Sequence, residues 1–384
     1  MANGVNRRSL FQLAGAAALL RSRLAGAQQV QSPAQQPPAP PRRGGNFGGN
    51  PEPFPAPNER STVAIAHGDD RRKNVYTALK SIDKDLQAKM KSKKYVVIKP
   101  NFVNTTNQLA ASHADAMRGI LDYLSESFKG PVVIAESSAG DTKVGYENFK
   151  YGALTSEYRK QQLKLIDLND EAKFERIAVL DADLHIVPCR IAARLVDPEA
   201  FVISSGMLKT HNTVIASLSI KNMALGAPLH QATNETPRWN EKRKFHVGLR
   251  QTHYNMMLNT QRLNWGASLI DGYEGMEGNG PNSGTPVPSR IALASVDYVA
   301  ADRIAAQTMG MDPNWLGYVK YCGDLGLGQF DGDKIDVIGA KVEDVKKTYR
   351  MHPDIERELQ WQGPLTELPF NLGWVHPMTN TRNA

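Results

Sequence analysis

The run Y-V-V-I-K-P-N at residues 95–101 decides the fold, together with the similar run P-V-V-I-A-E-S-S at residues 131–138. Both are short, continuous and β-branched, which is typical of strands buried on both faces of a parallel sheet. The segment between them has the apolar spacing of a helix over residues 113–128, with Ser112 as its expected N-cap. Strand, helix and strand in this order predict a right-handed α/β crossover.

The same alternation extends outward from this unit. A strand at residues 62–67 and one helix over residues 71–90 precede it. The later segments are less regular, and residues 229–249 show no clear period. We expect further strands at residues 163–168, 176–180, 184–188, 201–204, 267–270, 289–295 and 335–338, and helices at residues 250–265, 297–309 and 313–325. The prediction is an α/β fold with a mainly parallel sheet, helices on both faces and a mixed or elaborated middle region.

The N-terminus has the pattern of an export signal. Paired arginines, Arg7 and Arg8, precede a short Ala/Gly-rich apolar run, and small residues at 25–27 match a cleavage site. We therefore expect a twin-arginine signal peptide at residues 1–27, recognised by the twin-arginine export machinery, and a periplasmic or otherwise exported bacterial protein. No later apolar segment is long enough to span a membrane, so the mature chain is expected to have no transmembrane segment.

Composition divides the rest of the chain. Residues 28–60 are rich in Pro, Gln and Gly and predict a disordered linker. An α/β domain is expected at residues 61–345 and a C-terminal tail that wraps the surface at residues 346–384. The net charge is +7, but residues 1–60 carry seven basic and two acidic side chains, so the folded part is close to neutral. This balance argues against a nucleic-acid partner.

Cysteine content limits the cofactors. Cys189 and Cys322 are the two cysteines in the sequence, too few for an iron–sulfur cluster. In an oxidising compartment they could form one disulfide, and two separate buried thiols are the alternative. A divalent metal remains open as a cofactor.

A glycine-rich acidic stretch, I-D-G-Y-E-G-M-E-G-N-G-P-N-S-G-T-P, covers residues 270–286. We expect a loop here, because glycine allows left-handed backbone and close approach of a ligand. The stretch is not a P-loop, since no G-K-[ST] follows, and it lacks the position of a dinucleotide fingerprint. Carboxylates beside exposed backbone N–H groups favour a ligand site, and a solvated turn is the alternative.

Polar side chains follow several predicted strands. Because parallel strands end at the same edge of a sheet, these groups are expected to share one pocket. We assign candidate catalytic roles to Lys209, His211, Lys221 and Glu277. Candidate ligand-binding residues are Lys99, Asn101, Asn222, Gly278, Asn279 and Gly280. A divalent metal would be held by His211, Glu136, Asp271 and Glu274, although no H-x-x-x-H or H-E-x-x-H spacing supports it.

Over residues 61–340 the chain resembles the domain-of-unknown-function 362 family. The resemblance rests on K-P-N at 99–101, K-T-H at 209–211, I-K-N-M-A-L-G at 220–226, the acidic stretch at 271–284, and A-S-V-D-Y-V-A-A-D at 294–302. It implies one continuous fold and the location of a site. Some members carry ferredoxin-type cysteine clusters, which this chain lacks, and the family implies no general activity.

Two functional hypotheses follow. The first is an exported enzyme that binds a small anionic ligand through Lys209, Lys221 and Asn222, with the acidic stretch supplying acid–base groups or a metal. The alternative is a non-catalytic protein that carries a metal or cofactor to a partner.

Overall fold

The computed structural model of the protein describes residues 57–171, 173–231 and 239–363. The chain divides into two units, and the first, Met1–Glu52, lies outside the described residues. The predicted signal peptide and most of the predicted linker therefore lie outside them as well. Within the described ranges, no helix has both the length and the apolar character needed to cross a membrane.

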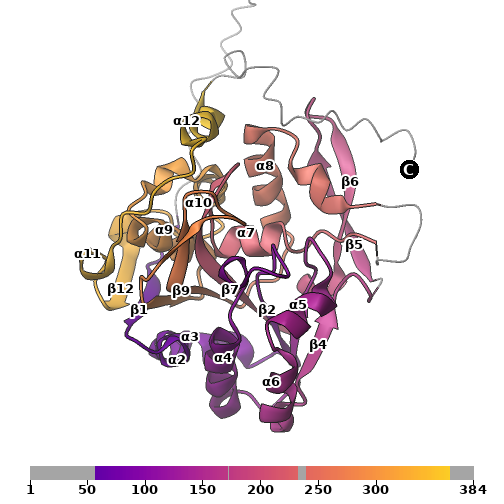
Figure 1. Cartoon of the computed structure of the whole chain (residues 1–384), viewed down its shortest axis with the longest axis vertical. Coiled ribbons are helices and arrows are strands. Elements are labelled where there is room, and N and C mark those ends of the chain that lie inside the picture. Colours follow the sequence, from indigo (N-terminus) through magenta and orange to yellow (C-terminus); the bar gives the residue numbers. More distant parts are fainter. Residues whose placement is uncertain (1–56, 172, 232–238, 364–384) are drawn as a thin grey trace, which may run out of the picture. The chain divides into compact units, whose positions relative to one another are not determined.

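A mixed, mostly parallel sheet forms the centre of the fold, in the strand order β12-β1-β11-β9-β7-β2-β3-β4 (Figure 1). Two short strands, β8 and β10, extend it by pairing with β7 and β9. Along the main path β11 alone runs against the other strands. The strand bounds are β1 (Ser61–His67), β2 (Tyr95–Lys99), β3 (Val132–Glu136), β4 (Lys164–Asp167), β7 (Ala200–His211), β8 (Ile215–Ser217), β9 (Ala267–Glu277), β10 (Thr285–Val287), β11 (Ile291–Ser295) and β12 (Ile335–Gly339).

Helices cover both faces of this sheet, as predicted. One buried apolar cluster joins the sheet to α7 (Ser219–Ala224), α8 (Leu249–Thr260), α9 (Tyr298–Thr308) and α10 (Gly317–Asp324). The other joins it to α2 (Arg71–Ser81), α3 (Asp83–Met90), α4 (Ala114–Ser127), α5 (Thr142–Asn148) and α6 (Gly152–Glu157). Figure 1 shows α2, α4 and α6 below the sheet and α7, α8 and α10 above it. Neighbouring strand residues face opposite clusters, as the two-residue repeat of a strand requires.

The crossover from β2 through α4 to β3 confirms the fold-deciding prediction. Its N-cap is different from the predicted one. His113 takes this position, and its Nδ1 accepts the backbone N–H of Asp115 at 3.1 Å. Ser112 instead accepts the Asn101 N–H and donates to the Ser205 carbonyl. Ser112 therefore ties the end of β2 to β7.

The predicted single helix over residues 71–90 is two helices. The backbone leaves the helical region at Ile82, which ends α2 and precedes α3. Asp83 and Asp85 lie in the first turn of α3, where negative charge is favourable beside exposed N–H groups. The even apolar spacing on both sides of Ile82 hid this break.

Two central strands are longer than predicted. β7 continues from Ser204 to His211 with every residue buried, since β8 and β9 supply hydrogen-bonding partners on either side. The expected acidic loop is also largely strand, because β9 runs to Glu277 and pairs with β10. Gly275 permits this by close packing. A Cβ there would lie 1.9 Å from the Tyr349 hydroxyl oxygen.

The predicted strands at residues 176–180 and 184–188 form a separate two-stranded sheet. β5 (Phe174–Leu180) and β6 (Ile186–Ala192) pair antiparallel, around a turn in which Leu184 has a φ of 67°. Such local pairing satisfies the backbone groups of both segments without a place in the main sheet. The middle region is elaborated in this way.

The described ends of the chain pack on the fold. Most of residues 346–363 are exposed or half-buried, but Tyr349 and Trp361 are buried and hold this segment to the fold, and it ends in two short turns, α12 (Ile355–Glu358) and η7 (Leu359–Gln362). At the other end, the Gln329 side chain donates to the carbonyls of Pro57 and Glu59. The last linker residues are therefore held by hydrogen bonds.

Candidate functional site

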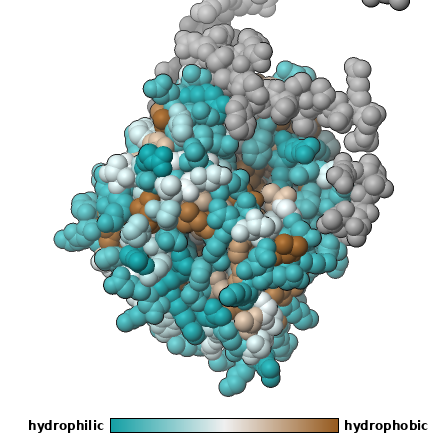
Figure 2. Space-filling model, viewed as in Figure 1, coloured by the Kyte–Doolittle hydropathy of each residue, from teal (hydrophilic) through white to brown (hydrophobic). Residues whose placement is uncertain are grey.

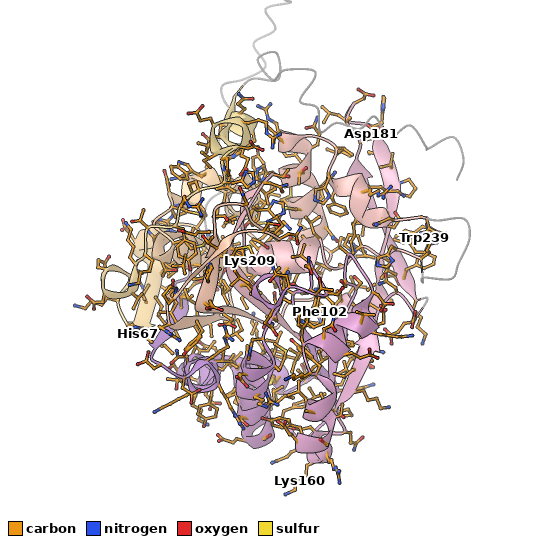
Figure 3. All side chains as sticks on the ribbon, viewed as in Figure 1. His67, Phe102, Lys160, Asp181, Lys209 and Trp239 are labelled. Carbon is orange, nitrogen blue, oxygen red and sulfur yellow. The ribbon has the colours of Figure 1, made fainter. Side chains whose placement is uncertain are left out.

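Four buried lysines gather at the carboxyl edge of the sheet, and we call them the lysine cluster: Lys99, Lys209, Lys221 and Lys242. Lys99 ends β2 and Lys209 lies near the end of its neighbour β7. Lys221 lies on α7, which packs on β7, and Lys242 lies in the 3₁₀ turn η4 (Glu241–Phe245). Figure 3 shows Lys209 near the middle of the molecule, whereas Lys160 lies at its rim.

Lys99 forms a buried ion pair with Glu136, at the end of the adjacent strand β3. Lys99 Nζ donates to Glu136 Oε1 at 2.8 Å and to the Pro100 carbonyl at 2.8 Å. The carboxylate also accepts the backbone N–H of Phe102 at 3.0 Å and of Ser137 at 2.8 Å. Three donors thus hold the carboxylate and both of its oxygens accept, as a buried carboxylate requires.

Two asparagines connect this pair to Lys209. Asn222 Oδ1 accepts from Lys99 Nζ and from Asn101 Nδ2, each at 3.1 Å. Lys209 Nζ donates to Asn101 Oδ1 at 2.6 Å and to the Ala110 carbonyl at 2.9 Å. The chain of contacts joins three elements that are far apart in sequence and fixes the Lys209 amine in place.

Lys242 is also held by the protein. Its Nζ donates to Ser137 Oγ and to the Leu225 carbonyl, each at 3.1 Å, and lies 3.4 Å from the Gly226 carbonyl oxygen. Sequence reasoning missed this residue, because residues 229–249 show no period that would place it in the core. Lys242 lies between the predicted strand at residues 201–204 and the predicted helix at residues 250–265, and no motif marks it.

Lys221 differs from the other three. Its residue is only 7% exposed, yet within the described ranges its amine makes no hydrogen bond or ion pair. The α7 residues beside it, Ile220, Met223 and Ala224, are fully buried. A buried amine without a partner is costly to the folded state, so this residue stands out as a functional candidate.

Burial lowers the pKa of every lysine in the cluster. Loss of water lowers the pKa of Lys221 to about 7, and the charge of Lys99 acts in the same direction. Burial also lowers the pKa of Lys242 to about 7, against the opposing effect of Glu136. The pKa of Lys209 lies well below its usual range because of burial and then Lys221. One carboxylate, Glu136, raises the pKa values of Lys99, Lys209 and Lys242 against the effect of burial, and neutral amines relieve the remaining excess of positive charge in the cluster.

Two histidines, His211 and His246, lie close enough to Lys221 for its charge to lower their pKa values. His211 is buried at the end of β7, and burial and then Lys221 hold its pKa well below the usual range. His211 Nδ1 accepts the Thr213 N–H at 3.1 Å. The His246 residue is exposed, and its Nδ1 lies 3.1 Å from the Lys242 carbonyl oxygen. Although the residue as a whole is exposed, loss of water around the imidazole and then the charge of Lys221 lower the pKa of His246 to about 4.

A carboxylate from another helix fixes α7. Asp302 on α9 accepts the N–H groups of Ser219 and Ile220, each at 2.9 Å. Burial raises the Asp302 pKa to about 8, while both N–H groups oppose the rise. Asp302 lies within the helix predicted at residues 297–309, and it caps the helix that carries Lys221.

Gly226 allows the lysine cluster to close. A Cβ there would lie 2.2 Å from Lys99 Cε and 2.2 Å from the Asn222 carbonyl oxygen. Gly226→Ala is therefore expected to displace the Lys99 amine and to lower the free energy of unfolding by about 1–3 kcal/mol, as overpacking does. Urea unfolding measures this. Gly152→Ala is the matched control, since a Cβ at Gly152 meets nothing within 4 Å. Equal stability of the two variants would contradict the close contact.

The acidic stretch contributes less than expected. Asp271 is buried, with Oδ2 at 3.2 Å from Arg71 Nε on α2. Glu277 accepts the Arg350 N–H at 2.8 Å and the Thr285 hydroxyl at 3.3 Å, so it closes the β9–β10 hairpin. Glu274 is exposed. None of these carboxylates contacts an amine of the lysine cluster.

Two of the predicted ligand-binding residues in the acidic stretch, Gly278 and Gly280, contact other parts of the protein in this fold. The Gly278 N–H donates to the Arg350 carbonyl at 2.8 Å, and the Gly278 carbonyl accepts from Thr210 Oγ1 at 2.9 Å. Gly280 packs against the Thr210 backbone, where a Cβ would lie 2.0 Å from the carbonyl oxygen. Asn279 is exposed. The hairpin therefore supports the end of β7.

The proposed metal ligands do not come together. Glu136 is bound to Lys99, Asp271 to Arg71, and Glu274 faces solvent. Across the described residues, no three His, Cys, Asp or Glu side chains form a group that could hold a metal ion. The predicted set of His211, Glu136, Asp271 and Glu274 is not assembled among the described residues. Cys189 and Cys322 are separate buried thiols, so the disulfide alternative is not realised.

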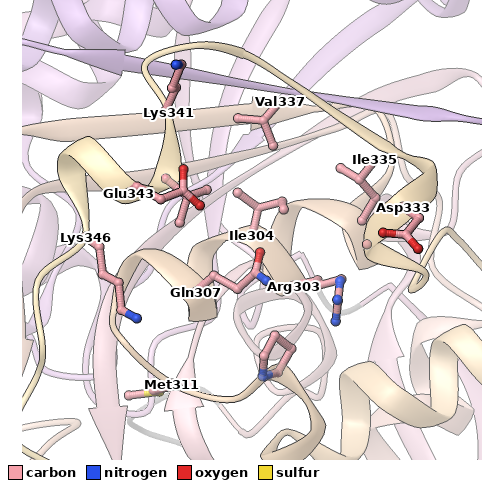
Figure 4. Close-up of a pocket in the computed structure, with 13 residues that line it drawn as sticks. Arg303, Ile304, Gln307, Met311, Asp333, Ile335, Val337, Lys341, Glu343 and Lys346 are labelled. Atoms are coloured by element: carbon pink, nitrogen blue, oxygen red, sulfur yellow. The ribbon is translucent and has the colours of Figure 1, made fainter.

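Two surface hollows lie away from the lysine cluster. One of about 560 Å³ lies between α9, β12 and α11 (Val342–Val345) and is lined in part by Arg303, Gln307 and Lys346 (Figure 4). Another lies beside Tyr95 and Arg194. Figure 2 shows a mainly hydrophilic face with small apolar groups. The cluster is therefore recognised by its chemistry, since neither hollow includes any of its lysines.

Comparison with known proteins places the chain in a family. Residues 96–307, more than half of the chain, match the family described as domain of unknown function (DUF362). The chain belongs to the DUF362 family. The match spans β2 through α9, so every lysine of the cluster falls within the DUF362 region. No curated protein matched this DUF362 chain.

One solved structure is similar at low identity. It is the crystal structure of a Thermotoga maritima protein from the Northeast Structural Genomics Consortium, 11% identical, with a TM-score of 0.37. The similarity covers 68% of the DUF362 chain and 60% of the Thermotoga protein. The DUF362 chain thus matches less than two thirds of that protein's length.

Proposed function

We propose that this protein is an enzyme that binds a small anion at the amine of Lys221. The observation that supports it most is the uncommitted Lys221 amine inside a cluster of four lysines and one carboxylate. An anion at Lys221 supplies the charge and the hydrogen-bond acceptor that the folded protein lacks there. A lysine ammonium binds a phosphate or carboxylate as a point charge.

The other three lysines of the cluster support anion binding through electrostatic attraction. Lys99, Lys209 and Lys242 donate to protein oxygens, so their amines are held in place before a ligand arrives. The share of these amines that is protonated attracts an anion more strongly at a buried site than in water, because little solvent screens the charge. Lys221 is the lysine whose amine is available to contact the anion directly.

An amine with a lowered pKa also favours catalysis. At neutral pH a large share of Lys221 is neutral, and a neutral amine can accept a proton or act as a nucleophile. This chemistry replaces the predicted roles of Lys209, whose amine is held by Asn101, and of Glu277, which closes a hairpin. No geometry among the described residues favours the alternative of a metal carrier.

Export remains part of the proposal. The arginine pair and apolar run at residues 7–20 support twin-arginine export to the periplasm, and these residues lie outside the described ranges. Fusion of residues 1–27 to a reporter that is active only after export tests it directly. A reporter that stays inside the cell with Arg7 and Arg8 intact would contradict export.

Inorganic phosphate is the probe for anion binding. We expect saturating phosphate, at about 100 times Kd, to stabilise the protein by about 2.7 kcal/mol, which raises Tm by several degrees. Lys221→Met is expected to abolish the shift, and Lys160→Met, at an exposed position, to leave it unchanged. Sodium chloride at matched ionic strength controls for screening.

Calorimetry gives a second readout of the same binding. An anion favours the ammonium form of Lys221, so binding is expected to take up protons near pH 7–8. Titrations in buffers of different ionisation enthalpy measure the proton uptake. If phosphate, sulfate and simple dicarboxylates all leave Tm unchanged in the wild type, small-anion binding is wrong.

A further inference from the structure

Lys221 has the environment of an amine that reacts with carbonyl groups. Ile220, Met223 and Ala224 on the same helix are fully buried and apolar, and the Lys221 amine is free of protein acceptors within the described ranges. Among described residues of the cluster, Lys99, Lys209 and Lys242 each donate to two or more oxygens. Reaction of any of those three would break existing hydrogen bonds, whereas reaction of Lys221 breaks none.

We propose that Lys221 forms an imine with a small anion that carries an aldehyde or ketone group. The proposal rests on the anion site described above and adds the class of substrate. The carboxylate or phosphate of such a molecule would be attracted by the positive charge that the cluster keeps, because the cluster holds four amines beside the one carboxylate of Glu136 and part of the Lys242 amine is protonated at pH 7. The carbonyl carbon would then lie against the uncommitted amine.

The reaction balances without an added oxidant or reductant. The neutral amine attacks the carbonyl carbon, so that a C–N bond forms and the π bond of the carbonyl breaks, and one proton passes from the nitrogen to the oxygen to give a carbinolamine. Loss of the hydroxyl with a proton from nitrogen releases one water and leaves the C=N bond. Desolvation and a nearby cation are both established means of keeping a lysine amine neutral and nucleophilic, and Lys221 has both.

Histidines are available for the proton transfers. His246 is exposed and close enough to Lys221 for the lysine charge to lower its pKa. An imidazole that is neutral at pH 7 can accept a proton from one atom and return it to another. His211 is buried with Nδ1 engaged by the Thr213 N–H, so His246 is the better placed of the two for exchange with solvent.

Reductive trapping tests the proposal on the full chain. Glyoxylate, an anionic aldehyde, is mixed with the protein and sodium cyanoborohydride at pH 7, and the modified peptides are identified by mass spectrometry. We expect Lys221 to be labelled at least about tenfold faster than exposed Lys160, because an amine with a pKa of about 7 is half neutral there, whereas an ordinary lysine is about 0.1% neutral or less.

Two comparisons define the expected pattern. The ratio of Lys221 to Lys160 labelling is expected to be several times higher with glyoxylate than with uncharged propionaldehyde, since the cluster attracts the anion. Phosphate is expected to slow labelling of Lys221 without slowing that of Lys160. Lys221→Arg keeps the charge and cannot form the imine, so it is expected to lose the label at this position and to keep a phosphate-dependent Tm shift.

The outcomes separate the imine from the anion site. If phosphate raises Tm through Lys221 but glyoxylate labels Lys221 no faster than Lys160, the imine is wrong and anion binding stands. If phosphate leaves Tm unchanged and Lys221 is not labelled, both are wrong. Fast labelling of Lys221 that phosphate does not slow, with no preference over propionaldehyde, would also overturn the proposal, because it shows a reactive amine without an anion site.

Discussion

Glu136→Gln is expected to lower the free energy of unfolding by about 3–5 kcal/mol, the cost of leaving one partner of a buried ion pair uncompensated. The Lys99 ammonium would lose its only carboxylate partner in the described fold. The two oxygens of Glu136 accept three N–H groups, from Lys99, Phe102 and Ser137. A glutamine presents one oxygen and one NH₂ group, so at least one donor would face another donor.

Chemical denaturation at pH 7 measures this loss. Glu157→Gln is the matched control, because Glu157 pairs with Arg118 at the surface and its side chain is 39% exposed, so its loss should cost 0–1 kcal/mol. The double variant Lys99→Met/Glu136→Gln should recover much of the loss, since it removes the charge as well as its partner. A loss below 1 kcal/mol for Glu136→Gln alone would show that the pair is not a buried ion pair in solution.

Lys221→Met is expected to stabilise the protein most at low pH, by up to about 4 kcal/mol at pH 6. Burial lowers the Lys221 pKa to about 7 in the folded state, below the ordinary value that it has in the unfolded chain. Below pH 7 the folded protein must hold a buried ammonium, so the full penalty is present. Methionine of similar length removes the amine and its desolvation cost.

The sign of the pH dependence follows from proton binding. Between about pH 7 and pH 10 the unfolded chain binds a proton at Lys221 that the folded chain does not, so wild-type stability rises with pH over this range. The gain from Lys221→Met should therefore shrink towards pH 10. Lys99, Lys209, Lys242, His211, His246 and Glu136 are the titratable groups around Lys221 and are present in both proteins.

Denaturation at pH 6, 8 and 10 tests this prediction. Raised pKa values of Asp302 and Glu358, each about 8, make stability fall as pH rises from about 4 to 8, but they contribute equally to wild type and variant. The difference between the two proteins isolates Lys221. Lys160→Met should follow wild type at every pH. A Lys221→Met protein that is less stable than wild type at pH 6 would contradict the uncommitted amine.

The sequence predicted the side chains at the carboxyl edge of the sheet better than those in the irregular middle region of the chain. Lys99 and Glu136 end strands that are rich in β-branched residues. Because parallel strands have their carboxyl ends at the same edge of a sheet, the sequence was enough to predict that these two side chains lie close together. Lys209 was placed correctly at the same edge, although β7 extends through it. Lys242 could not be placed, because its position depends on contacts with Ser137 and Leu225 that no local pattern encodes.

The acidic stretch shows the limit of composition as a guide. Glycine is most familiar in turns, but Gly275 is needed in β9 because the Tyr349 hydroxyl occupies the space of a side chain. That contact joins residues that are 74 positions apart, so it depends on tertiary packing. The carboxylates of Asp271 and Glu277 likewise found arginine partners, Arg71 and Arg350, that spacing alone did not indicate.

The hydrogen bonds from α7 to Asp302 have a consequence for protein engineering. The segment that carries Lys221 and the segment that carries Asp302 are separated by some 80 residues, yet one positions the other. A chimera that exchanged residues 217–228 alone with those of a relative would contain an α7 whose N-terminal N–H groups are not matched to Asp302 on α9. Residues 294–302 should be exchanged together with residues 217–228, so that the helix and the carboxylate that caps it come from the same protein.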